Sequence, residues 1–359
     1  MTELDRRDFL VQSAGAMAAV ALMPRLGLGA FSLSEPMNIG VIGLGRQGRA
    51  IIAELSGIEG ATIASICDTD ERRLKAGQRR AKDAKTITDA RAVLDDASIG
   101  AVCIATPTHL HRELVEQGLA AGKHVYCEAP MAHTLDDCRA IVQAARSAST
   151  IFQPGFHARS DPVYQLARTF FRSDAVRDLV SMSATRSKKT TWRTPANDPA
   201  RDKALNWRLD PEVSTGLAGE WGSHQFDVFH WYLDRFPVAI SGHGGIRLHD
   251  DGREVADTIS CSLAFEDGAT LDYQATLANS YGGMYELLRG TNASIKLAWS
   301  HGWLFKEADA PTQGWEVYAN RQQFHNDEGI TLIAGATKLA EQGKLKEGVG
   351  LPHTPLRYG

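Results

Sequence analysis

The alternation of apolar and polar positions changes character near residue 153. Before it, short continuous apolar runs alternate with segments whose apolar residues recur at helical spacing. Beyond it, period-two runs separated by turn residues predominate. The pattern predicts an α/β chain of two domains. The first is a doubly wound parallel sheet, and the second is an α+β domain with a large, mostly antiparallel sheet that has one open face.

Six parallel strands are expected in the first domain. They cover 38–42, 61–67, 86–87, 101–105, 124–127 and 150–152, with helices at 47–55, 89–94 (capped by Thr88), 110–121 and 135–148. The second domain is expected to contain a helix at 162–171, strands at 179–185, 238–248, 258–265, 270–277, 285–289 and 294–299, and an amphipathic helix at 327–342. The expected divisions are 1–35, 36–152, 153–343 and a tail at 344–359.

A glycine-rich turn joins the first strand to the first helix. It reads Gly43-Leu44-Gly45-Arg46-Gln47-Gly48. Gly43 permits the tight turn, Gly45 lets backbone N–H groups approach a pyrophosphate, and Gly48 allows close packing of the helix on the strand. The phosphates then lie at the positive end of the helix. The turn predicts a Rossmann dinucleotide site to which Arg46 and Gln47 also contribute.

Asp68 ends the second strand, twenty positions after Gly48. Its carboxylate is expected to accept hydrogen bonds from the adenosine ribose hydroxyls and to repel a 2′-phosphate. The expected cofactor is therefore NAD, with NADP less favoured. Arg72 and Arg73 follow closely and weaken that preference.

Residues 1–35 resemble an export signal. Arg6 and Arg7 precede an uncharged stretch that ends at Met23 and is short for a transmembrane helix. The paired arginines resemble a twin-arginine signal, and an N-terminal arm or a membrane-tethered leader is the alternative. We expect a periplasmic or secreted protein without stable membrane insertion, or a cytoplasmic one if the segment is not a signal.

The composition argues against several classes of function. A length of 359 residues with 43% apolar content is ample for a core. A net charge of −4 without a basic block gives no reason to expect nucleic acid. The five cysteines show neither a CxxC pair nor metal-ligand spacing, so we expect packed thiols and no metal site.

The irregular stretch 187–220 contains two Trp-Arg pairs, Trp192-Arg193 and Trp207-Arg208. Aromatic faces stack on the apolar faces of pyranose rings, while arginine donates to hydroxyls. The same pairs are equally suited to hold a structured lid together by cation–π contacts. Both interpretations stay open, but the stretch is too long for an idle connection.

Four motifs resemble those of the family of glucose–fructose oxidoreductase, inositol dehydrogenase and the MocA proteins. They are GLGRQG, ATPTHLH (105–111), EAPMAHT (128–134) and GEWGSHQFD (219–227), and the resemblance extends over 37–343. A secreted twin-arginine branch of that family matches the N-terminus. The resemblance implies an NAD-dependent oxidoreductase acting on a sugar, polyol or glycoside, and a homo-oligomer formed through the open sheet face.

The resemblance also implies which residues surround the nicotinamide riboside. They are Thr106, Pro107, His111, Glu128, Ala129 and Pro130. Glu128 is expected to bind ribose hydroxyls, and Pro130 to shape the pocket floor. For His109 and His111, capping a helix or facing solvent is the alternative.

Glu220, His224 and Asp227 are the candidate catalytic residues. Their i, i+4, i+7 spacing is expected to place them within about 60° on one helix face. An acid one turn from a histidine raises the histidine's basicity and fixes its ring, as proton abstraction requires. By the resemblance, His224 is the acid/base residue and Asp227 a substrate or catalytic ligand. Glu220 stands where the family usually has Asp, and a solvated helix face is the alternative.

Ala129 is the main departure from the family pattern, which usually has a lysine that polarises the reacting hydroxyl and carries its proton. Lys188 or Lys189 would then have to reach in from the second domain. His157, at the crossover between the domains and close to Arg159, is the other candidate.

Three activities follow from these residues. The first is a sugar or polyol dehydrogenase, with NAD that dissociates each cycle or stays bound. The second is an NAD-dependent glycosidase, which oxidises a hydroxyl transiently, eliminates the aglycone, adds water and returns the hydride; Ala129 favours it. The third is a catalytically silent sugar-binding protein, which His224 and its acidic neighbours disfavour.

Overall fold

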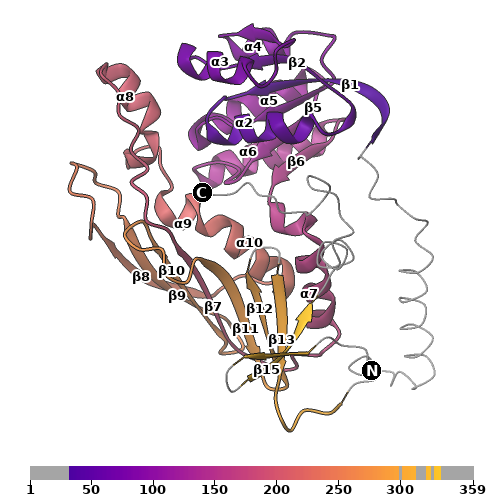
Figure 1. The fold of residues 1–359 in the computed structure, drawn as a ribbon, viewed down its shortest axis with the longest axis vertical. Helices are drawn as coiled ribbons and strands as arrows, with labels where there is room; N and C mark the ends of the chain where they lie inside the picture. Colours follow the sequence, from indigo (N-terminus) through magenta and orange to yellow (C-terminus); the bar gives the residue numbers. More distant parts are fainter. Residues whose placement is uncertain (1–31, 299–300, 313–320, 325–326, 333–359) are drawn as a thin grey trace.

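The computed structural model describes residues 32–298, 301–312, 321–324 and 327–332, and only the backbone of 32–35, 321–324 and 327–332. Two sheets organise these residues, with the N-terminal sheet above the C-terminal one in Figure 1. Residues 1–31 of the expected export signal, the tail at 344–359 and residues 333–342 of the last expected helix lie outside the described residues, and residues 32–35 form the start of the first strand.

The upper sheet has six parallel strands, as predicted, and their order is β3-β2-β1-β4-β5-β6. Its strands are β1 (Ser32–Ile42), β2 (Glu59–Cys67), β3 (Lys85–Ile87), β4 (Ala101–Ile104), β5 (His124–Glu128) and β6 (Phe152–Gly155). Its helices are α2 (Arg46–Leu55), α3 (Glu71–Gln78), α4 (Ala90–Leu94), η1 (Thr108–Leu110), α5 (His111–Ala120) and α6 (Leu135–Ser147). Separate apolar clusters, one containing Val41 and Ile52 and the other Val102 and Val115, are consistent with continuously apolar strands buried on both faces.

Two details of this sheet correct the sequence-based expectations. Asp89, and not Thr88, caps α4, because the extended backbone of Asp89 lets its Oδ1 accept a hydrogen bond from the Arg91 amide at 3.0 Å. The last strand begins at Phe152 and runs to Gly155, later than the expected 150–152.

The lower sheet has nine strands in the order β14-β15-β13-β12-β11-β7-β10-β9-β8. They are β7 (Leu179–Ser187), β8 (Ala239–Gly245), β9 (Thr258–Ala264), β10 (Thr270–Thr276), β11 (Met284–Gly290), β12 (Ala293–Ala298), β13 (His301–Lys306), β14 (Arg321–Phe324) and β15 (Asp327–Leu332). The β7–β10 pair is parallel, and the other described pairs are antiparallel. The predicted, mostly antiparallel sheet is confirmed.

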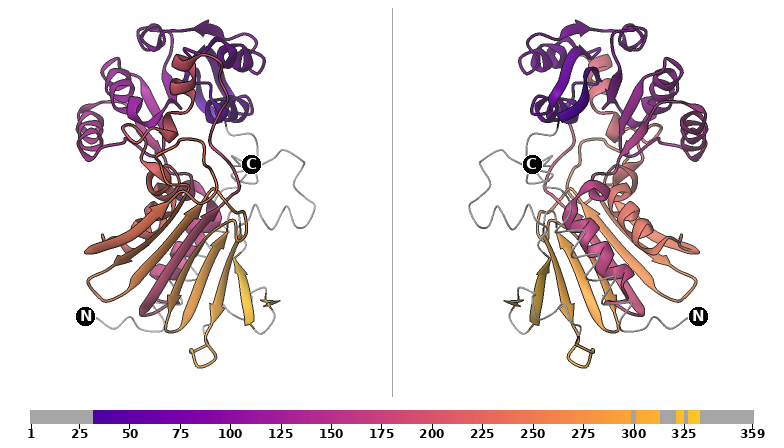
Figure 2. Two further views of the ribbon diagram at one scale, coloured as in Figure 1. Left: turned by 90° about the vertical axis from the view of Figure 1, so that its left-hand side faces the viewer. Right: turned by 90° about the vertical axis from the view of Figure 1, so that its right-hand side faces the viewer.

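The helices of this half are η2 (His157–Ser160), α7 (Pro162–Arg172), α8 (Pro199–Leu205), η3 (Trp207–Leu209), α9 (Gly216–Glu220) and α10 (Gly222–Leu233). α7 and α10 lie against one face of the lower sheet (Figure 2), and the buried apolar cluster of this half includes Phe229, Tyr232, Tyr273 and Leu288. The opposite face has no covering helix among the described residues.

The expected helix at 327–342 is wrong over its first part. Residues Asp327–Leu332 form β15, which pairs with β13 and β14, two strands that the sequence pattern did not reveal. Pairing with two neighbours overrides a helical spacing of apolar residues that is weak over so short a segment.

The segment 188–215 joins β7 to α9 and departs from the lower sheet. Figure 1 shows α8, in the middle of this segment, beside the upper domain and away from the sheet that precedes it. The segment thus brings residues of the second half of the chain to the edge of the upper sheet where its strands end. No helix among the described residues is long and apolar enough to cross a membrane.

Candidate functional site

A cleft of about 560 Å³ is lined by residues of both halves of the chain. That volume falls within the range of about 300–1,000 Å³ typical of small-molecule sites. Of the predicted site residues, the cleft lining includes Gly45, Arg46, Gln47, Thr106, Pro107, His111, Glu128, Ala129, Trp192, Trp207, Arg208, Glu220 and His224. The lining does not include Gly43, Gly48, Asp68, Pro130, His157, Arg159, Lys189, Arg193 and Asp227.

The glycine turn has the geometry that a dinucleotide requires. Gly43 has a positive φ of 91°, and a Cβ on Gly48 would lie 1.8 Å from the Gly43 oxygen, so both positions exclude a side chain. At Gly45 a Cβ would meet nothing nearer than Arg73 Nη1 at 4.0 Å. A side chain there would occupy the cleft itself, so Gly45 leaves room for a phosphate at the start of α2.

Asp68 is held against this turn. Its Oδ2 accepts a hydrogen bond from the Leu44 amide at 2.7 Å, and its Oδ1 accepts one from the Asp70 amide at 2.8 Å. The carboxylate is 8% exposed and lies behind the cleft lining, whereas Arg72 and Arg73 are part of that lining. The carboxylate and the arginines thus flank the same end of the site.

Glu128 and His111 fix the strand ends on the other side. Glu128 Oε1 accepts hydrogen bonds from Gln47 Nε2 and Tyr126 Oη, each at 2.9 Å, and burial raises the pKa of this carboxyl. The two ring nitrogens of His111 lie 3.0 Å from the backbone oxygens of Pro130 and Thr106, and burial lowers the pKa of the ring. His111 therefore lies between the segments that follow β4 and β5, and its neutral ring donates its one N–H to one of these two oxygens at a time.

Glu220 does not lie on the helix that carries His224 and Asp227, so the expectation of one shared helix face is wrong. α9 ends at Glu220, Trp221 interrupts the helical run, and α10 starts at Gly222. Glu220 turns toward Thr108, Thr215 and Arg208, with oxygen–donor distances of 3.1, 2.9 and 3.2 Å. It connects the segment after β4 to the segment 188–215.

Asp227 is also displaced from its expected place. It forms a bidentate pair with Arg159, with both N–O distances at 2.8 Å, and lies outside the cleft lining. The ring of His224 instead faces His157, with centroids 5.0 Å apart. Burial, His157 and Arg186 lower the pKa of His224 well below its usual value, so the ring is in its neutral, unprotonated form at neutral pH.

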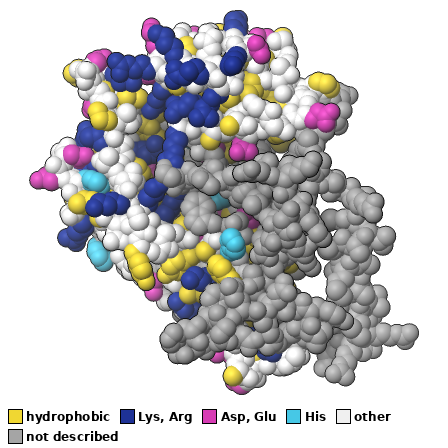
Figure 3. Space-filling view, viewed as in Figure 1, with side chains coloured by type: hydrophobic (Ala, Val, Ile, Leu, Met, Phe, Trp, Pro, Cys, Tyr) yellow, Lys and Arg dark blue, Asp and Glu magenta, His cyan; other side chains and the backbone are white. Residues whose placement is uncertain are grey.

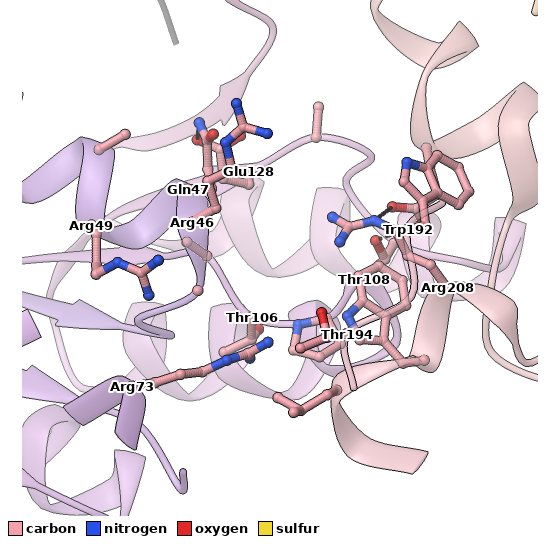
Figure 4. A pocket seen from close by; sticks show the side chains of 18 of the residues that line it. Arg46, Gln47, Arg49, Arg73, Thr106, Thr108, Glu128, Trp192, Thr194 and Arg208 are labelled. Carbon is pink, nitrogen blue, oxygen red and sulfur yellow. Dashed lines mark hydrogen bonds and ion pairs between the residues drawn. The ribbon is translucent and has the colours of Figure 1, made fainter. Parts of the chain in front are cut away.

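Of the two Trp-Arg pairs, Trp192, Trp207 and Arg208 line the cleft, whereas Arg193 does not. The Arg208 guanidinium lies 4.4 Å from the Trp207 ring centroid, and Trp192 packs edge-on against Trp221 at 5.4 Å. Figure 4 shows Trp192 and Arg208 across the cleft from Arg46 and Gln47. These side chains line the cleft and contact one another, as the cation–π interpretation expects, and sugar binding by them stays a prediction.

Arg193 and Lys189 are not in the cleft, in contrast to the expectation. Arg193 pairs with Asp251 at 2.8 Å, and exposed Lys189 donates its backbone N–H to Ser280 Oγ at 2.8 Å. The neighbouring Lys188 lines the cleft, and burial, Arg46 and Arg186 lower the pKa of its ammonium group. Successive residues beyond a strand end point in different directions, which explains why one lysine enters and the other does not.

The sequence-based choice missed several cleft residues. They are Arg49, Ala50, Ala105, Thr108, Thr190, Thr194, Arg201, Leu205 and Trp221. Ala105, Thr108 and Trp221 lie inside motifs already noted and were within reach of the same reasoning. Arg201 and Leu205 belong to α8, and nothing in the sequence shows that α8 meets the first domain.

Positive charge predominates in the cleft. Among its described lining residues, seven are Lys or Arg and two are carboxylates. Figure 3 shows Lys and Arg side chains gathered in a band over the upper domain and down toward the lower one. This excess suits a ligand that carries phosphates.

No group of His, Cys, Asp and Glu in the described part of the chain is placed to hold a metal ion, and all five cysteines are free.

Two models of one protein family match the chain. Residues 37–156 match the oxidoreductase family with an NAD-binding Rossmann fold, and residues 164–296 match the Gfo/Idh/MocA C-terminal domain. The chain belongs to the Gfo/Idh/MocA family of oxidoreductases. The predicted family and cofactor, NAD, are therefore confirmed.

Several relatives in the Gfo/Idh/MocA family have names that describe reactions of carbohydrates. Inositol 2-dehydrogenase 2 of Saccharopolyspora erythraea is 29% identical over 248 residues, which is 68% of each chain. The 2,7-anhydro-N-acetylneuraminate hydratase of Escherichia coli is 26% identical over 268 residues, 73% of this chain and 67% of the relative. Levoglucosan dehydrogenase, solved with NADH and L-sorbose, shares the fold at a TM-score of 0.69 and 21% identity, covering 84% of this chain and 80% of the other.

Proposed function

We propose that this enzyme transfers hydride from a hydroxyl-bearing carbon of a sugar, polyol or glycoside to NAD. The observation that carries the proposal is that the dinucleotide turn and the neutral His224 line the same cleft. Relatives named for inositol and levoglucosan dehydrogenation support the substrate class.

The chain's residues divide the work of this reaction. Bound NAD supplies the hydride-accepting ring. Gly45 and Arg46, which line the cleft, would meet its phosphates, and Glu128, which accepts a hydrogen bond from Gln47, would meet its ribose hydroxyls. His224 takes the proton of the reacting hydroxyl as the hydride leaves the adjacent carbon.

Lys188 is the candidate for the positive donor that Ala129 lacks. Ala129 and Lys188 line the same cleft, with Lys188 entering from the end of β7. An ammonium group there would stabilise the negative charge that develops on the oxygen as its proton leaves. Its lowered pKa brings proton exchange closer to neutral pH.

A redox-neutral cleavage of a glycoside is the second candidate. Oxidation of a ring hydroxyl acidifies the neighbouring C–H, so the aglycone can be eliminated, water added and the hydride returned. Ala129 motivates it, and a relative named as an anhydro-sugar hydratase is in keeping with it. Both reactions begin with the same hydride transfer, and a silent sugar-binding protein would perform neither.

A substrate panel distinguishes the three. The purified chain is mixed with NAD and either free sugars and polyols or 4-nitrophenyl glycosides, and NADH and 4-nitrophenol are followed together. The first proposal predicts NADH from a free sugar or polyol. Aglycone release without net NADH supports the glycosidase instead, and retention of sugar without either product supports a binding protein.

Two further properties complete the proposal. Arg6 and Arg7 support export by a twin-arginine route to the periplasm. Replacing both by Lys should block export, which fractionation of the cells measures.

The uncovered face of the lower sheet carries partly exposed Tyr285, Leu287 and Trp303, which support association with a second copy. Light scattering of the wild-type chain and a Leu287→Glu variant tests this.

A further inference from the structure

The segment 188–215 contributes a second wall to the cofactor end of the cleft. Thr190, Thr194, Arg201 and Leu205 line the cleft from this segment, while Arg72 and Arg73 line it from the first domain. Figures 1 and 2 show α8 beside the upper domain. The adenosine end of the site is therefore bounded by both halves of the chain.

One ion pair joins α8 to the first domain at this end. Arg201 Nε lies 2.5 Å from Asp70 Oδ2, and the side chains are 26% and 11% exposed. The other Asp70 oxygen caps α3 by accepting a hydrogen bond from the Arg73 amide at 2.9 Å. Because Asp70 lies two residues beyond Asp68, the pair forms beside the residues expected to meet the adenosine ribose.

The segment that carries Arg201 is held as a unit. Asn206 Oδ1 accepts a hydrogen bond from the Thr194 amide at 2.6 Å, and its Nδ2 donates to the Thr194 oxygen and to Asp202 Oδ1, both at 3.0 Å. Arg193 anchors the same stretch to Asp251. These bonds give α8 a fixed position, and the Arg201–Asp70 pair is the ion pair that joins α8 itself to the first domain.

We propose that residues 188–215 form an arm that completes the adenosine half of the NAD site, with the Arg201–Asp70 pair as the latch that governs release of the cofactor. This rests on NAD binding and not on the identity of the sugar. A cofactor held between two walls leaves only after one wall moves, and such opening steps limit product release in many enzymes. The latch therefore favours a cofactor that remains bound through successive turnovers.

NADH release from the full-length chain tests the latch. The protein is loaded with NADH, mixed with excess NAD in a stopped-flow instrument, and the loss of NADH fluorescence gives the off-rate. We expect Arg201→Ala and Asp70→Asn each to raise that rate about tenfold, as for loss of a charge-assisted hydrogen bond. The asparagine keeps an oxygen to cap α3, and Asp70 is outside the cleft lining.

The double variant separates a latch from a direct cofactor contact. If the two residues act as one pair, the double variant releases NADH no faster than either single one. Lys203→Ala is the matched control, since Lys203 is on the same helix, is 82% exposed and lies outside the lining. A wild-type off-rate in Asp70→Asn overturns the proposal. Because no sugar is present, an absence of sugar oxidation would count against the proposed function alone.

Discussion

Arg159 and Asp227 form a bidentate ion pair that joins η2 to α10. The elements it joins carry His157 and His224, whose rings face each other at 5.0 Å. Since both oxygens of Asp227 are engaged by one guanidinium, the pair acts as a brace between the two histidine-bearing elements. This geometry replaces the expectation of an acid that orients His224 from within the cleft.

Asp227→Asn should lower stability more than catalysis. Arg159 is 43% exposed, so solvent screening limits the loss to about 1 kcal/mol. We expect a lower melting temperature and a kcat within a few-fold of wild type, and the same for Arg159→Ala. A kcat reduced by orders of magnitude at an unchanged melting temperature would restore Asp227 as a catalytic ligand.

The pH profile of kcat/KM should report the neutral state of His224. Burial, His157 and Arg186 lower its pKa below the usual value of 6.5, so the basic form persists through neutrality and is lost only in acid. Arg186→Gln removes one cationic neighbour and should move the acid limb to higher pH. An acid limb at the wild-type pH would show that a group other than His224 determines it. Circular dichroism checks that the Arg186→Gln variant is folded.

Lys188 and Lys189 offer a matched pair of variants. Lys188→Ala should reduce kcat by about 10²-fold, within the range of general acid–base assistance, whereas Lys189→Ala should have little effect because its side chain is outside the cleft. Adding Ala129→Lys to Lys188→Ala should restore part of the rate, since both positions line the same cleft. Equal effects of the two single variants would remove Lys188 from the reaction.

Cofactor choice should follow the charge at Asp68. The wild type is expected to bind NAD more tightly than NADP, because the buried carboxylate repels a 2′-phosphate. Asp68→Ala should narrow the difference, since Arg72 and Arg73 remain in the cleft. Tighter binding of NADP by the wild type in isothermal titration would show that the arginines outweigh the acid.

Most of the fold and part of the site could be predicted from the sequence. The parallel sheet followed from its apolar runs, and the Gly43–Gly48 turn from backbone constraints, because both are local properties. The prediction that Glu220 and His224 share one helix face was wrong, because residue spacing alone cannot reveal the interruption of the helix at Trp221. Arg201 reaches the cofactor end only through long-range packing of α8, which leaves no local pattern in the sequence.

The central claim is that His224 removes the proton while NAD receives the hydride. The most direct measurement is a single turnover of NAD-loaded wild-type and His224→Ala proteins with the best sugar or glycoside of the panel, followed by nicotinamide absorbance. The account predicts reduced nicotinamide in the wild type and a rate about 10²–10⁴-fold lower in the variant, with NADH affinity unchanged. A His224→Ala variant that reduces NAD at the wild-type rate would contradict it.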